Sequence, residues 1–301
     1  MYRTAESMIE GLKAQGFVFS QSIKVLEGRF EPADAEWNYK DVPHLKEIHD
    51  LVEGVPGAIE QSYWAGFFVQ KIGPFRIPLS VFNYAPDRSS NIYFSSVGPF
   101  TLIIKSNWVS TATSMTKVTT EYNLGSLPFL RFTHRLIHQL LGRNYQLLME
   151  ADLPMRLRRG DLRARGYQFL GDSDGNGFLE STNLVSKRVL APSNAPVINW
   201  TVDISSVAEG STLIGSNDIS GIRIVRSGDS ITFFPRICMH EGANLDDAEM
   251  INDCLVCPWH GRSVKAVGKV VDNRVDHQYV GSGISAACQD AVLMVEGKIL
   301  K

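Results

Sequence analysis

The stretch from Cys238 to His260 constrains this chain more than any other part of its sequence. Cys238 and His240 are separated by one residue, and sixteen residues later Cys257 and His260 are separated by two. Each half therefore pairs one thiolate with one imidazole. Two cysteines and two histidines can hold a [2Fe–2S] cluster, with the cysteines on one iron and the histidines on the other. The spacing predicts two facing loops that bring all four ligands to one tip.

Zinc is the alternative for these four side chains, since two cysteines and two histidines also suit a tetrahedral zinc ion. The usual zinc arrangement pairs cysteine with cysteine and histidine with histidine, whereas each half here mixes the two residue types. Gly242 and Gly261 stand where each loop must turn sharply. The pattern therefore favours the iron–sulfur cluster over zinc.

Length and composition limit the class of protein. The chain has 301 residues, enough for two cores, and carries a net charge of −2, which does not suit a nucleic-acid partner. No apolar run reaches the roughly 18 residues of a membrane span, and the N-terminus lacks a signal-peptide core. Cys254 and Cys288 remain outside the cluster, too few for a disulfide framework. We therefore expect a cytoplasmic protein without a membrane anchor.

The strand and helix patterns predict an α+β domain. Segments rich in aromatic and β-branched residues follow one another over residues 62–124, with short turns between them, and predict a curved antiparallel sheet. Helical periodicity appears over residues 41–53, 129–141 and 145–163. A curved sheet that grips a long C-terminal helix leaves a cavity between the two layers, where ligands commonly bind.

A linker near residue 190 predicts two domains. The strand pattern ends in the segment LAPSNAP, which contains Pro192 and Pro196, and short strands begin again at Val197. We expect an α+β domain over residues 1–190 and a small all-β domain that holds the cluster over residues 197–301.

A second candidate metal site lies far from the cluster cysteines. Asp41, His44 and His49 form the pattern D-x2-H-x4-H. Two histidines with a remote carboxylate make the facial triad of non-haem Fe(II) oxygenases, which leaves open positions for O2 and substrate. Residues five apart align on one face only if the helix widens locally into a π-type turn. The alternative is two solvated histidines on a charged helix.

The third ligand of such a site should be a carboxylate on another element that faces the cavity. Asp152 follows the apolar run 147–149 on the long helix, so we expect it on or near the inward face, with Glu150 as the second choice. We expect the nearby Arg156, Arg158 and Arg159 to form a solvated or salt-bridged face. His134 and His138 are a competing pair with helical spacing, but no glutamate follows His134, and we expect surface or core histidines there.

These motifs together resemble the Rieske non-haem iron oxygenases, specifically the alpha subunits that hydroxylate aromatic rings. The four cluster residues match all four cluster ligands of that family, and His44 and His49 match its iron ligands. Asp152 matches the third iron ligand more loosely, because Ala151 interrupts the acidic pair that the family usually has there. Asp41 matches the carboxylate that bridges a cluster histidine to an iron histidine in the family.

The order of the domains departs from that family, in which the Rieske domain comes first. Here the expected catalytic domain, with a helix-grip fold like the START (SRPBCC-like) superfamily, is N-terminal. The resemblance implies a homotrimer, in which electrons cross between neighbouring subunits. It also implies a low-potential cluster, because the positions of the extra disulfide and of the hydroxyl groups in high-potential Rieske proteins hold Ala243, Trp259, Arg262 and Val264.

The resemblance implies a monooxygenase or dioxygenase. An external NAD(P)H-dependent reductase or ferredoxin would reduce the cluster, which would reduce a mononuclear Fe(II) that activates O2. Aromatic, weakly charged strands predict an apolar or aromatic substrate. One alternative is a Rieske electron-transfer protein fused to a START-like ligand-binding domain without mononuclear iron. A respiratory-type electron carrier is a third possibility, but the sequence lacks the membrane anchor and the extra cysteines.

Overall fold

The structure is a computed structural model, and it describes residues 4–41, 44–49, 52–59, 63–72, 75–170, 188–195, 197–271, 274–278, 284–289 and 291–297. The chain divides into two compact units. The first consists of Met1–Asp161 with Asp172–Val185, and the second of Leu162–Gly171 with Ser186–Lys301. Among the described residues, none of the helices combines the length and the apolar character that a membrane span requires.

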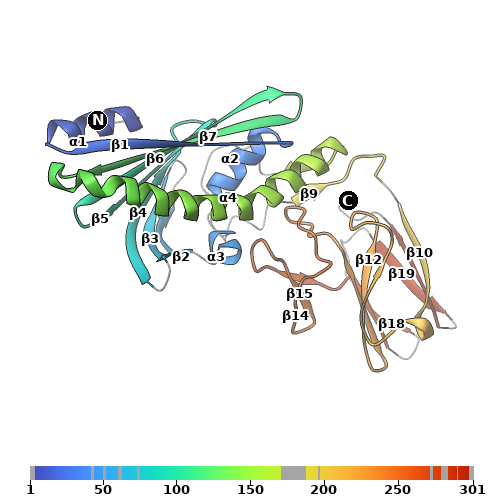
Figure 1. Cartoon of the computed structure of the whole chain (residues 1–301). Helices are drawn as coiled ribbons and strands as arrows, with labels where there is room; N and C mark the ends of the chain where they lie inside the picture. Colours follow the sequence, from blue (N-terminus) through green and yellow to red (C-terminus); the bar gives the residue numbers. More distant parts are fainter. Residues whose placement is uncertain are drawn as a thin grey trace. The chain divides into compact units, whose positions relative to one another are not determined.

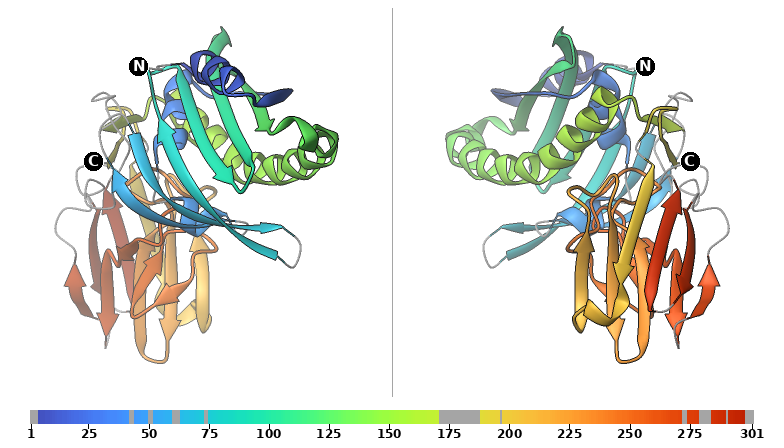
Figure 2. Two further views of the ribbon diagram at one scale, coloured as in Figure 1. Left: turned by 90° about the vertical axis from the view of Figure 1, so that its left-hand side faces the viewer. Right: turned by 90° about the vertical axis from the view of Figure 1, so that its right-hand side faces the viewer.

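A seven-stranded antiparallel sheet with the order β1-β7-β6-β5-β4-β3-β2 forms the first unit (Figure 1). Its strands are β1 (Val18–Gly28), β2 (Val52–Ile59), β3 (Tyr63–Ile72), β4 (Phe75–Tyr84), β5 (Ser90–Val97), β6 (Phe100–Ala112) and β7 (Met115–Ser126). The helices are α1 (Ala5–Ala14), α2 (Pro32–Lys40), α3 (His44–Ile48), the 3-10 turn η1 (Pro128–Thr133) and α4 (His134–Ala164). The sheet curves and α4 runs along it, as Figures 1 and 2 show. This is the expected helix-grip fold.

The long helix is continuous where the sequence predicted two segments. The two expected segments at 129–141 and 145–163 join into the single helix α4, which begins at His134, after the 3-10 turn η1, and continues through Pro154. Proline lacks the backbone N–H that a helix interior uses, so packing against the sheet has to hold this turn. Gly160 explains part of that packing, because a Cβ there would overlap the carbonyl oxygen of Arg29 and the Cα of Phe30. The helix can approach this backbone closely only with glycine at that position.

The two faces of the sheet are covered differently. The side chain of Ala5 on α1 packs with Ile92 and Ile103 on one face. Alternate residues of the same strands point to the other face, where the hydroxyl of Tyr145 on α4 donates to Thr120 at 2.8 Å. The face toward α4 carries two further buried clusters, centred on Trp64 with Phe68 and Val81, and on Phe30 with Trp108 and Val118.

The second unit consists of short antiparallel strands. Its sheets have the orders β10-β20-β19, β11-β12-β13-β17-β18, β14-β15-β16 and β8-β9. The strands are β8 (Gln168–Leu170), β9 (Arg188–Leu190), β10 (Ile198–Asp203), β11 (Gly210–Ile214), β12 (Ile222–Ser227), β13 (Ser230–Pro235), β14 (Met250–Ile251), β15 (Cys254–Val256), β16 (Ser263–Lys265), β17 (Gly268–Val271), β18 (Arg274–Gln278), β19 (Ile284–Gln289) and β20 (Val292–Gly297), with the 3-10 turn η3 (Ile204–Ser206) after β10. Figure 2 shows these strands from two sides.

The core of the second unit includes residues from before the expected linker. Leu162, Tyr167, Phe169 and Val189 pack in one buried cluster with Phe233 and its neighbours. The amide of Val189 also donates to the carbonyl of Met239 at 2.9 Å. The segment Leu162–Gly171 therefore belongs to the second unit, although it precedes the proline-containing linker from which the boundary at residues 190–197 was expected.

Candidate functional site

Three side chains of metal-binding type meet inside the first unit. His44, His49 and Asp152 each offer a ligand atom, and these atoms lie within 4.8 Å of one another. Asp152 Oδ1 lies 3.0 Å from Nε2 of His49 and 3.4 Å from Nε2 of His44. All three residues are at least nine-tenths buried. The structure thus brings the two histidines of the expected motif to the carboxylate expected on the long helix.

The local fold around α3 differs from the prediction. The helix expected over residues 41–53 is shortened to α3, and β2 begins at Val52. No π-type widening is present in α3, because His44 is its first residue and His49 lies just beyond its last residue, Ile48. The two rings face each other edge to face, with centroids 5.4 Å apart and planes at 66°. The end of the helix, and not a bulge within it, turns the two rings toward the same point.

Asp41 orients His44 through the far side of its ring. The backbone carbonyl of Asp41 accepts a hydrogen bond from Nδ1 of His44. One carboxylate oxygen of the fully buried Asp41 lies 3.7 Å from the same Nδ1 atom. A proton held on Nδ1 leaves the lone pair of Nε2 toward Asp152, as a metal-ligating histidine requires.

Asp152 is held as a carboxylate. Burial by itself raises its pKa, but the adjacent imidazoles of His44 and His49 and the charge of Arg156 hold that pKa far below the ordinary range. Its Oδ2 atom lies 3.5 Å from a guanidinium nitrogen of Arg156, while Oδ1 faces the histidines. Glu150, the second choice, is exposed and accepts a hydrogen bond from Gln146 at 3.0 Å. The geometry therefore favours Asp152 over Glu150.

The arginines of α4 are more buried than a solvated face would be. Arg156 is fully buried, and its Nε donates to Asn38 Oδ1 at 2.9 Å. Its guanidinium also lies 5.0 Å from the ring centroid of Tyr39. Arg159 is equally buried and forms an ion pair with Asp34 at 3.1 Å. The expectation of salt-bridged arginines holds for Arg159, but both Arg156 and Arg159 lie in the interior because α2 packs over them.

His134 and His138, the competing pair, are bound to serine hydroxyls. Ser20 Oγ lies 2.7 Å from Nδ1 of His134 and 2.8 Å from Nε2 of His138. Ser126 and Ser22 contact the remaining ring nitrogens at 2.7 and 3.1 Å. Each ring nitrogen thus has a hydroxyl partner, and the pair fastens the start of α4 to β1 and β7.

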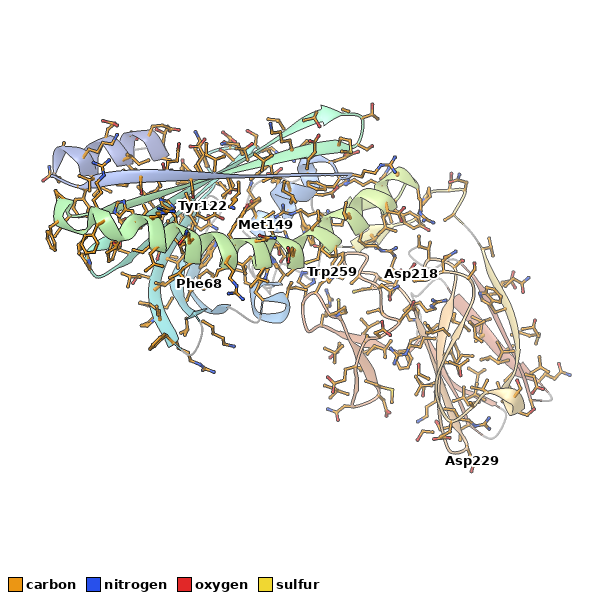
Figure 3. The ribbon with its side chains drawn as sticks, in the orientation of Figure 1. Phe68, Tyr122, Met149, Asp218, Asp229 and Trp259 are labelled. Carbon is orange, nitrogen blue, oxygen red and sulfur yellow. The ribbon has the colours of Figure 1, made fainter. Side chains whose placement is uncertain are left out.

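A cavity of about 480 Å³ begins at the candidate metal ligands. It lies between α4 and the concave face of the sheet, and its walls are mostly apolar. Phe68 of β3, Tyr122 of β7 and Met149 of α4 line it and are labelled in Figure 3. Its volume falls within the ~300–1,000 Å³ typical of small-molecule sites.

The second unit holds the four cluster residues on two matching loops. In the first loop the amide of Cys238 donates to Ala243 at 2.8 Å, and the amide of Gly242 donates back to Cys238 at 2.9 Å. The second loop repeats both bonds between Cys257 and residues Arg262 and Gly261. Gly242 and Gly261 have φ values of +86° and +61°, a conformation that favours glycine.

The side chains on these loops suit a [2Fe–2S] cluster. The rings of His240 and His260 lie edge to face, with centroids 5.1 Å apart. The thiols of Cys238 and Cys257 lie within hydrogen-bonding distance, which lowers the pKa of Cys238 and raises that of Cys257. Ala243 and Trp259, at the positions of the extra disulfide of high-potential proteins, are both buried.

Comparison with protein-family models identifies this part of the chain. Residues 202–281 match the family described as the Rieske [2Fe-2S] domain, and the match includes all four cluster residues. The second unit carries a Rieske domain. Such a domain supports electron transfer and a [2Fe–2S] cluster as its cofactor. No curated protein matches the chain in sequence.

Solved structures resemble the first unit at low sequence identity. An aromatase/cyclase (Zhui) from Streptomyces sp. R1128 is 10% identical, with a TM-score of 0.41, and the match covers 49% of this chain and 97% of that one. A START superfamily protein from Mycobacterium smegmatis is 12% identical, with a TM-score of 0.37 and coverages of 44% and 92%. Norcoclaurine synthase from Thalictrum flavum, in complex with dopamine and hydroxybenzaldehyde, is 14% identical, with a TM-score of 0.37 and coverages of 47% and 88%.

Sequence reasoning missed several residues of the site. Arg156 and Asn38 were not associated with Asp152, and Asn83, Asn91 and Tyr122 were not recognised as part of the cavity wall. For Asn91 a signal existed, because it shares one face of β5 with the cavity-lining Tyr93 two residues later. No comparable signal linked Arg156 to Asn38, because that contact depends on how α2 packs against α4.

Proposed function

We propose that this chain is a Rieske-type oxygenase with a mononuclear Fe(II) bound by His44, His49 and Asp152. The observation that supports this proposal is the convergence of these three buried side chains at a cavity, in a chain that also carries a Rieske domain. Two histidines and one carboxylate are the donor set of non-haem iron oxygenases. When bound there, Fe(II) supplies open coordination positions at which O2 can react with a substrate.

The residues around the ligands fix the geometry of the site. The Asp41 carbonyl holds the proton on Nδ1 of His44, so that Nε2 stays available as a donor. Arg156 holds Oδ2 of Asp152, which leaves Oδ1 for the metal. His44 and His49, together with Arg156, also hold the pKa of Asp152 far below its ordinary range. The mostly apolar wall of the cavity excludes water and holds a small-molecule substrate beside the ligands.

The Rieske domain would supply the electrons in this proposal. An external NAD(P)H-dependent reductase or a ferredoxin would reduce its cluster. Asp41 is proposed to orient His44 and to take part in the link between the two centres. The homotrimer implied by the family resemblance is part of the proposal, and analytical ultracentrifugation of the intact chain tests it separately.

His49→Ala provides the functional test. Without the His49 imidazole, a facial triad loses one ligand, whereas the Rieske domain is untouched. We expect the visible and electron paramagnetic resonance spectra of the cluster to persist while reductant-dependent O2 consumption in a substrate screen stops. His138→Gln, a change in the serine-bound pair, should retain O2 consumption. Equal O2 consumption by wild type and His49→Ala would overturn the proposal.

A second candidate function is a Rieske electron carrier fused to a ligand-binding domain without iron at His44 and His49. The cavity supports this alternative, because an apolar cavity can bind a ligand without any metal. Under this alternative, His49→Ala should alter neither the iron content nor the electron-transfer rate of the protein.

A further inference from the structure

Among the buried polar atoms of the cavity wall that are without hydrogen-bond partners in the described part of the protein, three are distributed across the strands of the sheet. They are Oδ1 of Asn83, Oδ1 of Asn91 and the hydroxyl of Tyr122. Their side chains are 7%, 4% and 3% exposed, and all three line the cavity. Further such atoms in the cavity wall include Nδ2 of Asn144 on α4, Oγ of Ser95 and the hydroxyl of Tyr39. Buried polar atoms are rarely left unpaired, because leaving them so is costly. The set therefore points to a ligand that pairs with them.

These atoms are spread across the sheet. Asn83 of β4 stands opposite Tyr93 of β5, which stands opposite Ile104 of β6, which stands opposite Tyr122 of β7. Asn91 is two residues before Tyr93 on β5, so it points to the same face. With neighbouring strands ~4.8 Å apart, the Asn83–Asn91 pair and Tyr122 are separated by roughly 10–14 Å. One small functional group cannot reach both positions.

The charge of the cavity wall restricts the ligand further. Among the described lining residues, the side chains that ionise near neutral pH are Asp41, His44, His49 and Asp152, and all four belong to the candidate metal site. The rest of the wall is apolar or neutral and polar. A charged group placed there would be buried without a counter-ion, which is strongly unfavourable. The wall therefore selects against anions and cations away from the metal end.

We infer that the substrate is a neutral, extended, mainly apolar molecule with a hydroxyl group at one position and a hydroxyl or carbonyl group at a second, well-separated position. One group pairs with Asn83 and Asn91 on β4 and β5, and the other pairs with Tyr122 and Asn144. A hydroxyl suits either position, because it can both donate and accept a hydrogen bond. This inference rests on the proposed function only in calling the ligand a substrate, and it adds two polar groups to the apolar or aromatic substrate expected from the sequence.

Isothermal titration calorimetry with three naphthalene probes tests the inference. The probes are naphthalene, a dihydroxynaphthalene with its hydroxyls at opposite ends, and the corresponding dicarboxylate. The intact chain carries its cluster, and a chelator removes mononuclear metal, so binding is read without any oxidation. We expect the diol to bind at least 5-fold more tightly than naphthalene, and the dicarboxylate to bind at least 10-fold more weakly than the diol. These factors follow from one or two net hydrogen bonds and from an unpaired buried charge.

Variants locate the effect. Tyr122→Phe and Asn91→Leu should each weaken diol binding about 2- to 10-fold and leave naphthalene binding unchanged. The controls are Tyr63→Phe and Asn107→Leu, because neither residue lines the cavity, and both should bind the diol as wild type does. Equal affinities for diol and naphthalene, preference for the dicarboxylate, or no measurable binding of the diol would each overturn the inference. An iron site that fails to load would not alter any of these results, so the two proposals can fail independently.

Discussion

Nε2 of His49 and Oδ1 of Asp152 lie 3.0 Å apart, although one residue follows the short helix α3 and the other lies in the second half of the long helix α4. His44 reaches the same oxygen from the start of α3. Because the ligands come from two separate helices, α3 and α4, the site depends on the tertiary fold of the helix-grip unit. Changes that shift α4 relative to α3 should therefore affect metal binding even where they touch no ligand.

Arg156→Lys should weaken metal binding without removing a ligand. Lysine keeps the charge but cannot reproduce the guanidinium geometry that contacts Asp152 and Asn38 together. Loss of such a supporting contact typically lowers metal affinity ~10- to 100-fold. We therefore expect the dissociation constant for Fe(II) to rise at least ~10-fold in anaerobic titrations. Arg158→Lys is the matched control, since Arg158 is part-exposed and pairs with Asp161. Unchanged affinity in Arg156→Lys would show that Arg156 does not position Asp152.

The two glycines Gly142 and Gly160 of α4 should respond in opposite directions to alanine. A Cβ at Gly142 meets only the end of the Lys24 side chain, at 3.7 Å or more, so Gly142→Ala should stabilise the fold by ~0.4–1 kcal/mol. A Cβ at Gly160 overlaps the backbone of Arg29 and Phe30, so Gly160→Ala should cost about 1–3 kcal/mol. Urea unfolding measures both. Equal stabilities of the two variants would contradict the close packing of α4 on this backbone.

His134 should make the stability of the first unit fall in mild acid. Burial, with the charges of His138 and Arg131, lowers the pKa of His134 in the folded protein. The unfolded chain, with a histidine pKa of about 6.5, therefore binds more protons than the folded one below that pH. The contribution of His134 to stability is therefore complete above about pH 6.5. It is lost as the pH falls from that value through the lower pKa of the folded protein. In urea titrations from neutral pH to mild acid, His134→Gln should have a shallower pH dependence than wild type, and an equal or steeper slope would refute this assignment.

The Rieske cluster should have a reduction potential near the lower limit of its class. Ala243 and Trp259 replace the extra disulfide positions, and Arg262 and Val264 replace hydroxyl-bearing residues near the cluster. Fewer hydrogen bonds to the cluster leave more electron density on it, which favours a potential near about −150 mV in a range of ~−150 to +300 mV. A redox titration followed by electron paramagnetic resonance measures this value. A potential well above zero would contradict the expectation of a ferredoxin-like donor.

Local patterns predicted much of the fold and of the site. The alternating strands of residues 62–124, the long helix and the C-x-H…C-x2-H motif each act within a short stretch, and the structure has a curved sheet, α4 and two matching cluster loops. The helix expected over residues 41–53 was wrong in extent, because the chain leaves α3 after Ile48 and enters the sheet at Val52. Contacts between elements, such as the one between Arg156 and Asn38, were not predictable, because the hydrophobic periodicity of a segment does not show how α2 packs against α4.

Iron analysis of anaerobically reconstituted protein tests the central claim most directly. After incubation with excess Fe(II) and removal of unbound metal, wild type should retain about three irons per chain, two in the cluster and one mononuclear. His49→Ala and Asp152→Ala should retain about two, with an unchanged cluster spectrum. About two irons in the wild type, or about three in both variants, would contradict a mononuclear iron site at His44, His49 and Asp152.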